Sequence, residues 1–441
     1  MWKPSIPRSD ADSRAIFEAL RWDIESGLLR PGDRLPPQRE LAAALGVNLS
    51  TVSRAYQEAS RLHLIGGEVG RGTYVLPAGA AASLFEQQRY ADHCIDLSRS
   101  VPAPMPDDGA LAGALAALSP GEQSDAARYS SPEVLERARS AAAQWLTFRG
   151  LAERPETVIL CAGAHAALMA LLLEKAKDGD PILVESFSFP GLKALAKQLR
   201  LRLVPVDQDG EGVTPEALDA AARASNARLA VLVPNLQNPT GAAMGDKRRA
   251  DIAQVVARHD LTVIEDDVYG ALSGRPLLSR DLGHRGIVVS SLSKTVMPGL
   301  RFGFIAGGSA SLAGLRSSPY LTNWMTAPLS LVIGAAWIEN GTALKRLDWQ
   351  QAEVAARWEA MVSALGPTSL PPSPHAWLTV EDAPEAVVER CRENGVAVAS
   401  GNLFATGRRT APRIRICLTG ARSRTDLDTA LAHLSAAGAR L

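Results

Sequence analysis

The sequence has few cysteines, no excess of charge of either sign, and few lysines. Its 441 residues include four cysteines, and 47 basic side chains balance 47 acidic ones. A chain without net charge predicts no global electrostatic attraction to nucleic acid or membranes. Only eight of the basic residues are lysine, so a lysine in an unusual setting is notable. The cysteines are scattered without zinc or redox spacing, and we expect free thiols in a reducing cytoplasm at Cys94, Cys161, Cys391 and Cys417.

We expect no signal peptide, because the first residues include prolines and charged side chains, and the sequence has no continuous apolar run of membrane-spanning length. Residues 157–173 and 317–338 carry no charge, but glycine and histidine interrupt the first run, and prolines and an asparagine interrupt the second. A membrane helix needs about 20 consecutive apolar residues. With 46% hydrophobic and 21% charged residues, the composition is that of a globular protein. The length predicts two or three units, and we expect a soluble cytoplasmic protein.

Residues 1–76 have the pattern of three helices followed by a short hairpin. Apolar residues at helical spacing predict a first helix that ends near Gly27. A second helix is predicted over Gln38–Leu45, and a glycine turn separates it from a third over Ser50–Leu62. Glycines then flank short β-prone pieces within residues 66–75, which indicates a wing hairpin.

Two helices joined by a tight turn, with polar and basic groups on the second, are typical of a helix-turn-helix that enters the major groove. Val52, Tyr56 and Ala59 are expected to face the core of this unit. The candidate DNA contacts are Arg34, Arg39, Asn48, Ser50, Thr51, Ser53, Arg54 and Arg71. Ten basic and nine acidic residues give this segment a charge of +1, which predicts modest non-specific binding unless dimerisation doubles the contacts. The alternative is a helical protein-docking module.

This order of elements resembles the GntR family of winged-helix regulators. The matching motifs are Gly27-Leu28, Pro31-Gly32, Arg34-Leu35-Pro36, Arg39-Glu40-Leu41-Ala42, Leu45-Gly46-Val47, Thr51-Val52 and Gly72-Thr73-Tyr74-Val75. The sequence departs from the family pattern at Pro37, at Asn48-Leu49 and at Ser53, where the family has other residues. The resemblance therefore implies the fold and DNA binding, without a base-by-base assignment.

Beyond a predicted linker at residues 77–93, strands and helices alternate through residues 94–441. Apolar β-type runs occur at Val158–Leu160, Ile182–Val184, Leu203–Val206, Leu229–Val233, Thr262–Ile264, Ile287–Val289 and Phe302–Ala306. Helical stretches lie between most of them, which predicts a mostly parallel sheet covered on both faces. From about residue 345 a long helix, two strands and a terminal helix indicate a smaller α/β subdomain.

Polar residues follow three of these strands, at the edge where such sheets bind ligands. Lys294 comes just beyond a buried strand among hydroxyl residues, with Arg301 seven residues further on. This arrangement suits a Schiff-base lysine beside a phosphate site. Asp266, at the end of another strand, can hold a pyridinium nitrogen protonated, while Asn238 and Tyr269 can hydrogen-bond a ring oxygen. These residue types together predict a site for pyridoxal 5′-phosphate (PLP).

The same residues resemble those of the fold-type I, aspartate-aminotransferase family of PLP enzymes, over about residues 94–441. The resemblance implies that Lys294 forms the internal aldimine and that Asp266 contacts the ring nitrogen. It implies O3′ contacts from Tyr269 and Asn238, and stacking of Phe189 on the ring. The expected fold is thus an α/β fold-type I PLP-dependent transferase-like domain behind a winged helix-turn-helix.

The resemblance also implies how the phosphate and a substrate are held. The implied phosphate contacts are Gly163, Ala164, His165, Ser291, Ser293, Arg301 and, from the neighbouring subunit of a dimer, Tyr129. Arg415 matches the arginine that binds a substrate α-carboxylate, with Arg413 on the same strand face as its rival. Ser100 stands where the family usually has a glycine near the substrate, a difference that bears on substrate access.

A GntR-type unit fused to an aminotransferase-like body resembles the MocR-type regulators. This resemblance implies a PLP-binding transcription factor that forms a homodimer, often head-to-tail, and responds to PLP itself, to an amine or to an amino acid. The alternative is a working aminotransferase that carries a DNA-binding head, since the catalytic residue set is complete. A winged helix has little use in an enzyme without a DNA task, so the sequence favours regulation, with slow transaminase side activity compatible with it.

Overall fold

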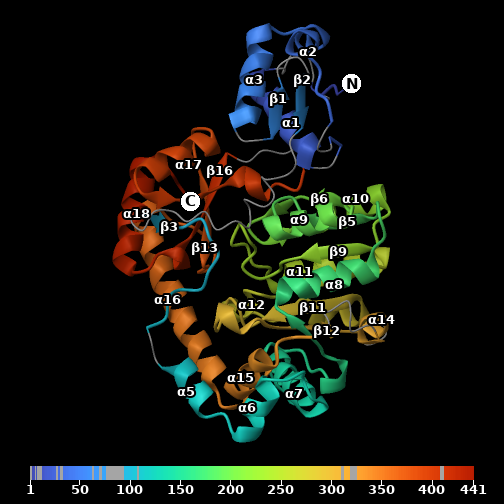
Figure 1. Cartoon of the computed structure of the whole chain (residues 1–441), viewed down its shortest axis with the longest axis vertical. Helices are drawn as coiled ribbons and strands as arrows, with labels where there is room; N and C mark the ends of the chain where they lie inside the picture. Colours follow the sequence, from blue (N-terminus) through green and yellow to red (C-terminus); the bar gives the residue numbers. More distant parts are fainter. Residues whose placement is uncertain are drawn as a thin grey trace. The chain divides into compact units, whose positions relative to one another are not determined.

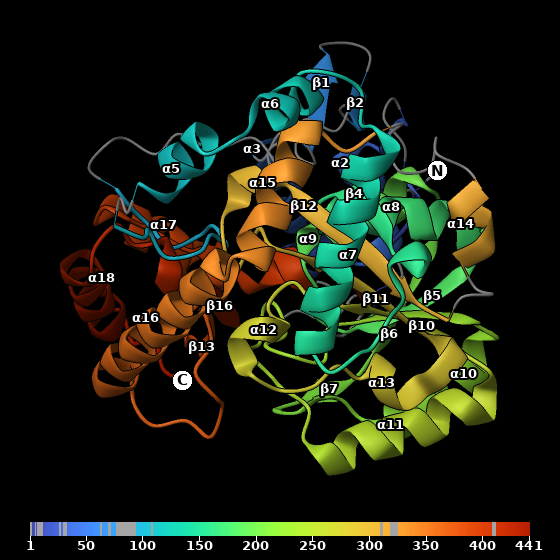
Figure 2. The same cartoon turned by 90° about the horizontal axis from the view of Figure 1, so that it is seen from below.

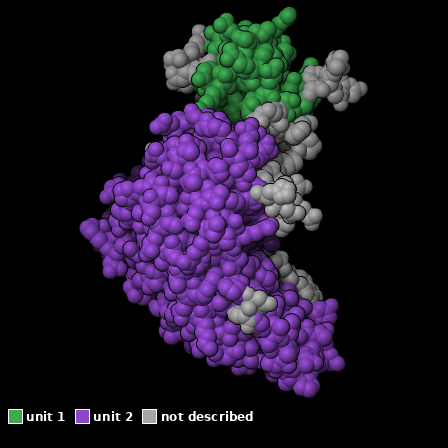
Figure 3. All heavy atoms as spheres, turned by 90° about the vertical axis from the view of Figure 1, so that its left-hand side faces the viewer, with its two compact units in different colours: residues 1–89 green, residues 90–441 purple. Residues whose placement is uncertain are grey.

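The computed structural model describes residues 2–4, 6, 12–25, 28–29, 33–61, 64–68, 72–75, 94–106, 109–308, 312–317, 325–407 and 412–441. Two compact units make up the chain, Met1–Arg89 and Tyr90–Leu441, and Figure 3 colours them separately. The predicted linker at residues 77–93 lies outside the described residues. Within the described part of the chain, no helix has the length and apolar character needed to cross a membrane.

The N-terminal unit contains three helices and one hairpin, as the sequence predicts. The helices are α1 (Ser13–Glu25), α2 (Gln38–Leu45) and α3 (Leu49–Arg61), and the antiparallel strands are β1 (Ile65–Glu68) and β2 (Gly72–Val75). Gly46 ends α2 with a φ of 71°, a conformation that glycine adopts at little cost. This residue makes the tight turn of the helix-turn-helix possible.

One face of α3 holds the core of this unit together. Val52, Ala55, Tyr56 and Ala59 are all buried there, at the spacing of a single helix face. The Tyr56 hydroxyl donates to the Pro36 carbonyl at 2.9 Å, so the helix is also tied to the connector before α2. The opposite face of α3 is left for contacts outside the unit.

The C-terminal unit is built on a seven-stranded sheet of order β4-β12-β11-β10-β9-β5-β6 (Figure 1). Its strands are β4 (Ile159–Ala162), β5 (Pro181–Glu185), β6 (Arg202–Val206), β9 (Leu229–Leu232), β10 (Thr262–Asp266), β11 (Gly286–Ser291) and β12 (Phe302–Gly307). Only β12 pairs antiparallel with its neighbours, while the remaining pairs are parallel. The prediction of a mostly parallel sheet is confirmed.

Helices cover both faces of this sheet. They are α7 (Pro132–Phe148), α8 (Ala164–Lys175), α9 (Pro190–Gln198), α10 (Pro215–Ser225), α11 (Asp246–His259), α12 (Gly270–Ser273), α13 (Ser279–Leu282), α14 (Ala313–Ser317) and α15 (Pro328–Glu339). Strand residues pack alternately toward α8 and α9, as Val231 does, and toward α10 and α11, as Ala230 does. Figure 2 shows α8 and α11 on opposite sides of the sheet. Burial on both faces explains why the strands are continuous apolar runs.

The remaining elements of this unit belong to the smaller subdomain or to short connecting segments. They are β3 (Ile95–Asp96), α5 (Ala110–Ala116), α6 (Pro120–Ala126), β7 (Gln208–Asp209), β8 (Gly212–Val213), α16 (Thr342–Leu365), β13 (His375–Thr379), α17 (Pro384–Glu393), β14 (Val396–Ala397), β15 (Ala399–Ser400), β16 (Arg413–Cys417) and α18 (Arg424–Ala436). Strands β13, β16 and β15 form an antiparallel sheet. Strand β3 pairs with β14, which fixes the start of the body against its C-terminal part.

Candidate functional site

The site lies at the carboxyl ends of the parallel strands. Asp266 ends β10, Lys294 follows β11 by three residues, and Asn238 lies in the loop after β9. Gly163 connects the end of β4 to the start of α8. Because β9, β10 and β11 are direct neighbours in the sheet, residues distant in sequence meet at one edge.

Lys294 is half-buried, and its amine points toward the chain segment that precedes α5. Its Nζ donates to the backbone carbonyl of Ser100. Burial lowers the pKa of Lys294, and the positive charges of Arg415 and Arg301 lower it further. An amine with a lowered pKa is unprotonated more of the time, which suits nucleophilic attack on a carbonyl.

Asp266 is a buried carboxylate at the end of β10, with 4% of its surface exposed. Its Oδ1 accepts from the Val268 amide at 3.2 Å. Burial raises the pKa of Asp266 to about 7, and the neighbouring carboxylates add to the effect. A cationic group beside this carboxyl would hold it ionised. The site thus has the acceptor that a protonated pyridine nitrogen requires.

A buried ion pair fixes the turn after Asp266. Arg149, at the end of α7, donates through Nε and Nη2 to the two oxygens of Asp267 at 3.1 and 2.9 Å. Both side chains are buried, so the geometry is bidentate and shielded from water. Glu265, on the other side of Asp266, accepts from the amides of Leu278 and Ser279. These contacts hold the carboxyl group of Asp266 in place.

Tyr269 and Asn238 lie beside Lys294 and Asp266. The Tyr269 ring meets the ring of His375 edge-on, with 5.3 Å between centroids, and burial raises the pKa of the Tyr269 hydroxyl. Asn238 accepts from Nη1 of Arg415 at 3.4 Å through Oδ1. The structure therefore brings both predicted ring-oxygen contacts to the same place as the lysine.

The predicted phosphate contacts form an anion-binding cradle. Arg301 donates to the hydroxyl of Ser293 at 3.3 Å and to the carbonyl of Ala162 at 3.0 Å, while Ser291 bonds to Ser293 at 2.9 Å. Gly163 has a φ of 89°, and a Cβ there would collide with the Arg301 guanidinium. The helix α8 starts directly afterwards, at Ala164, and the first N–H groups of a helix favour an anion.

Phe189 and His165 lie close together at the edge of this cradle. A Cβ on Gly191 would lie 3.2 Å from the Phe189 ring and 3.4 Å from Cε1 of His165. Burial, together with the charge of Arg301, lowers the pKa of His165. Tyr129 lies elsewhere, in the loop between α6 and α7, and 79% of its surface is exposed. Its predicted contact across a dimer stays a prediction.

Arg415 lies at the site, whereas its rival Arg413 does not reach it. Arg415 is 4% exposed, and its guanidinium stacks over the Phe404 ring at 5.0 Å from the centroid. Nη1 donates to the Ser100 hydroxyl and Nη2 to the Ser98 carbonyl. Arg413 is half-buried and donates instead to the Trp377 carbonyl at 3.3 Å.

Four further residues line the site, of which the sequence motifs single out only Ser100. His375 is fully buried, its Nε2 lies 2.7 Å from the Gln237 carbonyl, and burial lowers its pKa to about 3. Phe404 supports Arg415, and Ser98 contributes only a backbone carbonyl. A backbone carbonyl is common to all residue types, so no motif could reveal Ser98. His375 could have been found only if the position of β13 relative to the neighbouring strand had been known from the sequence.

Most predicted DNA contacts lie on the surface of the N-terminal unit. Arg34, Arg39, Asn48, Ser50 and Arg54 are exposed, and Thr51 is half-buried. The predicted contact Arg71 lies outside the described residues.

Ser53 differs from the other candidate DNA contacts. Its hydroxyl donates to Oε1 of Gln38 at 2.6 Å, which connects α3 to α2. This side chain is thus engaged in packing the two helices of the motif.

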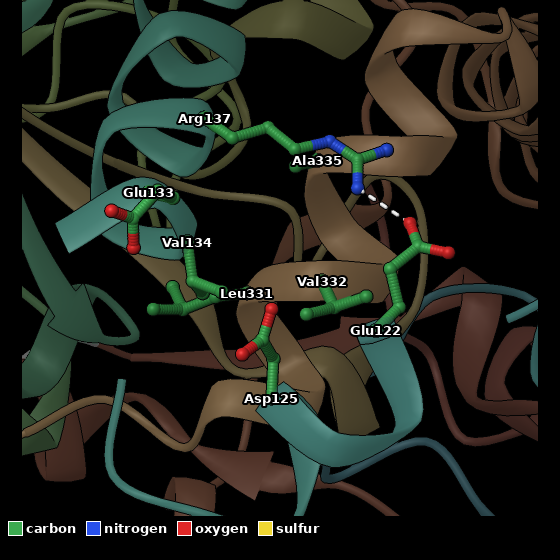
Figure 4. Close-up of a pocket in the computed structure, with 8 residues that line it drawn as sticks. All are labelled: Glu122, Asp125, Glu133, Val134, Arg137, Leu331, Val332 and Ala335. Atoms are coloured by element: carbon green, nitrogen blue, oxygen red, sulfur yellow. Dashed lines mark hydrogen bonds and ion pairs between the residues drawn. The ribbon is translucent and has the colours of Figure 1, made fainter. Parts of the chain in front are cut away.

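A separate pocket lies among α6, α7 and α15, and its lining includes none of the residues described above for the Lys294 site (Figure 4). It is lined by Glu122, Asp125, Glu133, Val134, Arg137, Leu331, Val332 and Ala335. Arg137 pairs with Glu122 at 2.7 Å and with Glu339 at 2.8 Å, so its charge is already balanced. Within the described part of the chain, no cluster of three or more His, Cys, Asp or Glu side chains could hold a metal ion.

Comparisons with known proteins agree with this two-part organisation. Residues 92–434 match the family described as aminotransferase class I and II, and residues 12–75 match the gntR family of bacterial regulatory proteins. An archaeal alanine:glyoxylate aminotransferase of known structure has a TM-score of 0.74 at 20% identity, over 86% of this chain and 98% of its own. That likeness concerns the fold.

Two relatives are named as regulatory proteins. The vitamin B6 salvage pathway transcriptional repressor PtsJ of Salmonella typhimurium is 30% identical over 88% of this chain and 90% of its own length. The probable rhizopine catabolism regulatory protein MocR of Rhizobium meliloti is 29% identical over 67% and 66%. The chain therefore belongs to the MocR-type transcriptional regulators, in which a GntR-type helix-turn-helix domain is joined to an aminotransferase class I and II domain.

Proposed function

We propose that this protein is a PLP-binding transcriptional regulator whose winged helix binds operator DNA and whose Lys294 site senses PLP or a small amino compound. One observation carries the proposal. In a chain with a gntR-family DNA-binding unit, an amine, a buried carboxylate and an anion cradle meet at one edge of the sheet. In this proposal the Lys294 site binds the signal molecule, and the DNA-binding unit acts on the operator in response.

The chemistry of the residues fits PLP at each of its functional groups. Lys294 would receive the aldehyde, because its amine is half-buried and has a lowered pKa. Asp266 would hold the pyridine nitrogen protonated, which would also restore its own ionised form. Arg301 and the start of α8 would hold the phosphate. When bound, PLP supplies an electron sink for bonds of an attached amine.

Arg415 extends the site toward a second ligand. A guanidinium can hold a carboxylate through two parallel N–H bonds, and Arg415 is buried beside Lys294 rather than exposed to bulk water. An amino acid presents a carboxylate for Arg415 and an amine for the cofactor side. We propose amino acids, besides PLP itself, as the class of effector.

The names of the relatives point in the same two directions. PtsJ is named for the vitamin B6 salvage pathway and MocR for rhizopine catabolism. PLP is the active form of vitamin B6, so the first name corresponds to a regulator that responds to PLP status. For this chain, the proposal covers control by PLP or by an amino compound that reacts with it. We place its action in the cytoplasm, as a homodimer in which the exposed Tyr129 reaches the partner's phosphate site.

A working aminotransferase is the second candidate function. Lys294, Asp266, Tyr269 and Arg415 lie together, as transamination requires. The DNA-binding unit favours regulation over this alternative, because an aminotransferase does not need to bind operator DNA to catalyse its reaction. Single-turnover spectra with an amino acid, followed by addition of a keto acid, separate the two. Sustained turnover at an ordinary enzymatic rate of about 1–1000 s⁻¹ would favour the enzyme.

The proposal is tested by DNA binding with and without the cofactor. The protein is prepared in PLP-free and PLP-loaded forms, and its affinity for a labelled fragment of its own upstream region is measured at fixed salt. Fixed salt matters because phosphate contacts make DNA affinity depend steeply on ionic strength. We expect specific binding that differs between the two forms. Absence of specific binding in both forms, with this and other candidate operators, would contradict the regulatory function.

A further inference from the structure

The segment that precedes α5 is held at the site by backbone hydrogen bonds and by a buried side chain. Strand β3 pairs with β14, and the Cys417 amide donates to the Leu97 carbonyl at 2.7 Å. Leu97 is fully buried in the core of the smaller subdomain. These contacts hold the residues that follow, Ser98 to Ser100, against Arg415.

Ser100 contacts both functional groups of the proposed effector site. Its backbone carbonyl accepts from the Lys294 amine, and its hydroxyl accepts from Nη1 of Arg415. The carbonyl of Ser98 accepts from Nη2 of the same arginine. The terminal nitrogens of the Arg415 fork are therefore bonded to the chain's own oxygens, while its buried Nε has no partner.

We propose that Ser98–Ser100 is an internal ligand of Arg415, which a carboxylate effector must displace. The two oxygens of a carboxylate would take the places of the Ser100 hydroxyl and the Ser98 carbonyl. Both displaced acceptors are neutral, whereas a carboxylate carries the charge opposite to the guanidinium and can accept from both of its terminal nitrogens in two parallel bonds, which adds energy and geometric specificity. A carboxylate therefore binds Arg415 more strongly than the two neutral oxygens do, although the segment that carries them is attached to the protein.

The geometry also defines the size of the effector. A single residue, Ser100, reaches Lys294 with its carbonyl oxygen and Arg415 with its hydroxyl. Lys294 and Arg415 thus lie within the span of one small molecule, so a ligand whose carboxylate is held by Arg415 brings an amine only a few bonds away to the Lys294 end of the site, which describes a small amino acid. This inference rests on the proposed function, and it adds that the carboxylate acts by releasing a segment.

The released segment is well placed in the sequence to carry a signal. Residues 94–100 directly follow the predicted linker at 77–93, which joins the body to the DNA-binding unit. A ligand shifts an equilibrium only through its different affinity for two states. The two states here are Arg415 bound to Ser98–Ser100 and Arg415 bound to an effector carboxylate.

The first test measures the affinity of Arg415 for a simple carboxylate. Acetate is the probe, because it has no amine and cannot condense with PLP. It is titrated calorimetrically into the full-length, PLP-loaded protein at constant ionic strength. Ser100→Ala removes the competing hydroxyl and should tighten acetate binding by about tenfold or more, the usual effect of a hydrogen bond to a charged group.

Ser98→Ala is the matched control, because Ser98 contacts Arg415 through its backbone carbonyl and keeps that group. Its acetate affinity should change less than that of Ser100→Ala, because the Ser98 hydroxyl bonds to Asp96 Oδ1 at 2.6 Å and not to Arg415. Arg415→Lys should abolish binding in every background. Equal affinity of wild type and Ser100→Ala, or no binding by either, would overturn the proposal.

Hydrogen–deuterium exchange of the wild type gives an independent readout. The amides of Ser98 and Val101 are bonded within the segment, to Asp96 Oδ1 and to the Arg99 carbonyl. Acetate should speed exchange in a peptide covering residues 97–103 and leave β11 unchanged. Slower or unaltered exchange there would reject displacement. Neither readout involves DNA, so loss of operator binding would refute the proposed function without affecting these results.

Discussion

Gly163→Ala is the sharpest perturbation of the proposed phosphate site. Gly163 has a φ of 89°, and a Cβ there would collide with the guanidinium of Arg301. The unfavourable backbone conformation should lower the free energy of unfolding by about 1–3 kcal/mol. Displacement of Arg301 should remove a charge-assisted bond to the phosphate, worth about 1.5–3 kcal/mol. We therefore expect PLP to bind about 10- to 100-fold more weakly.

Gly179→Ala separates the collision from the backbone effect. Gly179 has a similar φ of 84°, but nothing lies within 4 Å of a Cβ placed there. Both variants should lose stability in thermal unfolding, and only Gly163→Ala should lose PLP affinity in an absorbance titration. PLP binding by Gly163→Ala with wild-type affinity would refute the phosphate cradle.

Three further predictions concern the carboxyl group, the DNA face and the effector arginine. With the pKa of Asp266 raised from 3.8 to about 7, the folded PLP-free protein binds more protons than the unfolded chain between these values. Its free energy of unfolding should therefore fall as pH rises through that window, by up to about 1.4 kcal/mol per pH unit from this group. Asp266→Asn should flatten this dependence on pH. If denaturant unfolding gave the same slope for the variant and the wild type, the raised pKa would be excluded. Arg54→Ala should weaken operator binding by about 1–3 kcal/mol if Arg54 reads a base. Arg39→Ala should weaken binding to all DNA sequences alike, with a shallower dependence on salt. If both variants gave the anisotropy curves of the wild type, this DNA-binding face would be excluded. Arg415→Lys should weaken the spectral response to amino acids and leave PLP affinity intact, whereas Arg413→Lys should change neither, and the opposite pattern would identify Arg413 as the effector arginine.

Most strands of the large sheet were predictable because they are buried on both faces, whereas the edge strand β6 is only partly buried. Ile182–Val184 and Ile287–Val289 are short apolar runs between helical stretches, and both lie within observed strands. The direction of β12 was not predictable, because an apolar run such as Phe302–Ala306 is the same in parallel and antiparallel pairing. The pairing of β3 with β14 involves two residues on each strand, too few to leave a sequence pattern.

The site was predictable where its residues follow strands and not where they come from elsewhere. Lys294 and Asp266 each stand directly after or at the end of an apolar run, so their meeting at one sheet edge follows from the parallel order. The sequence favours Arg415 over Arg413 because an apolar run directly follows Arg415, whereas the contacts that bury Arg415 depend on the fold. The contact of Ser98 with Arg415 is made by backbone and therefore depends entirely on the fold.

The central claim is that occupancy of the Lys294 site changes DNA binding. The most direct measurement is the anisotropy of labelled operator DNA as PLP is titrated into complexes of the wild type and of Lys294→Ala. Removal of the amine prevents a covalent bond to PLP while Asp266 and Arg301 remain, so the variant keeps only part of the cofactor's binding energy. Both proteins should bind DNA without PLP, and the response of Lys294→Ala should vanish or move to higher PLP concentrations. An identical response at the same PLP concentration, or no response by the wild type at saturating PLP, would contradict the account.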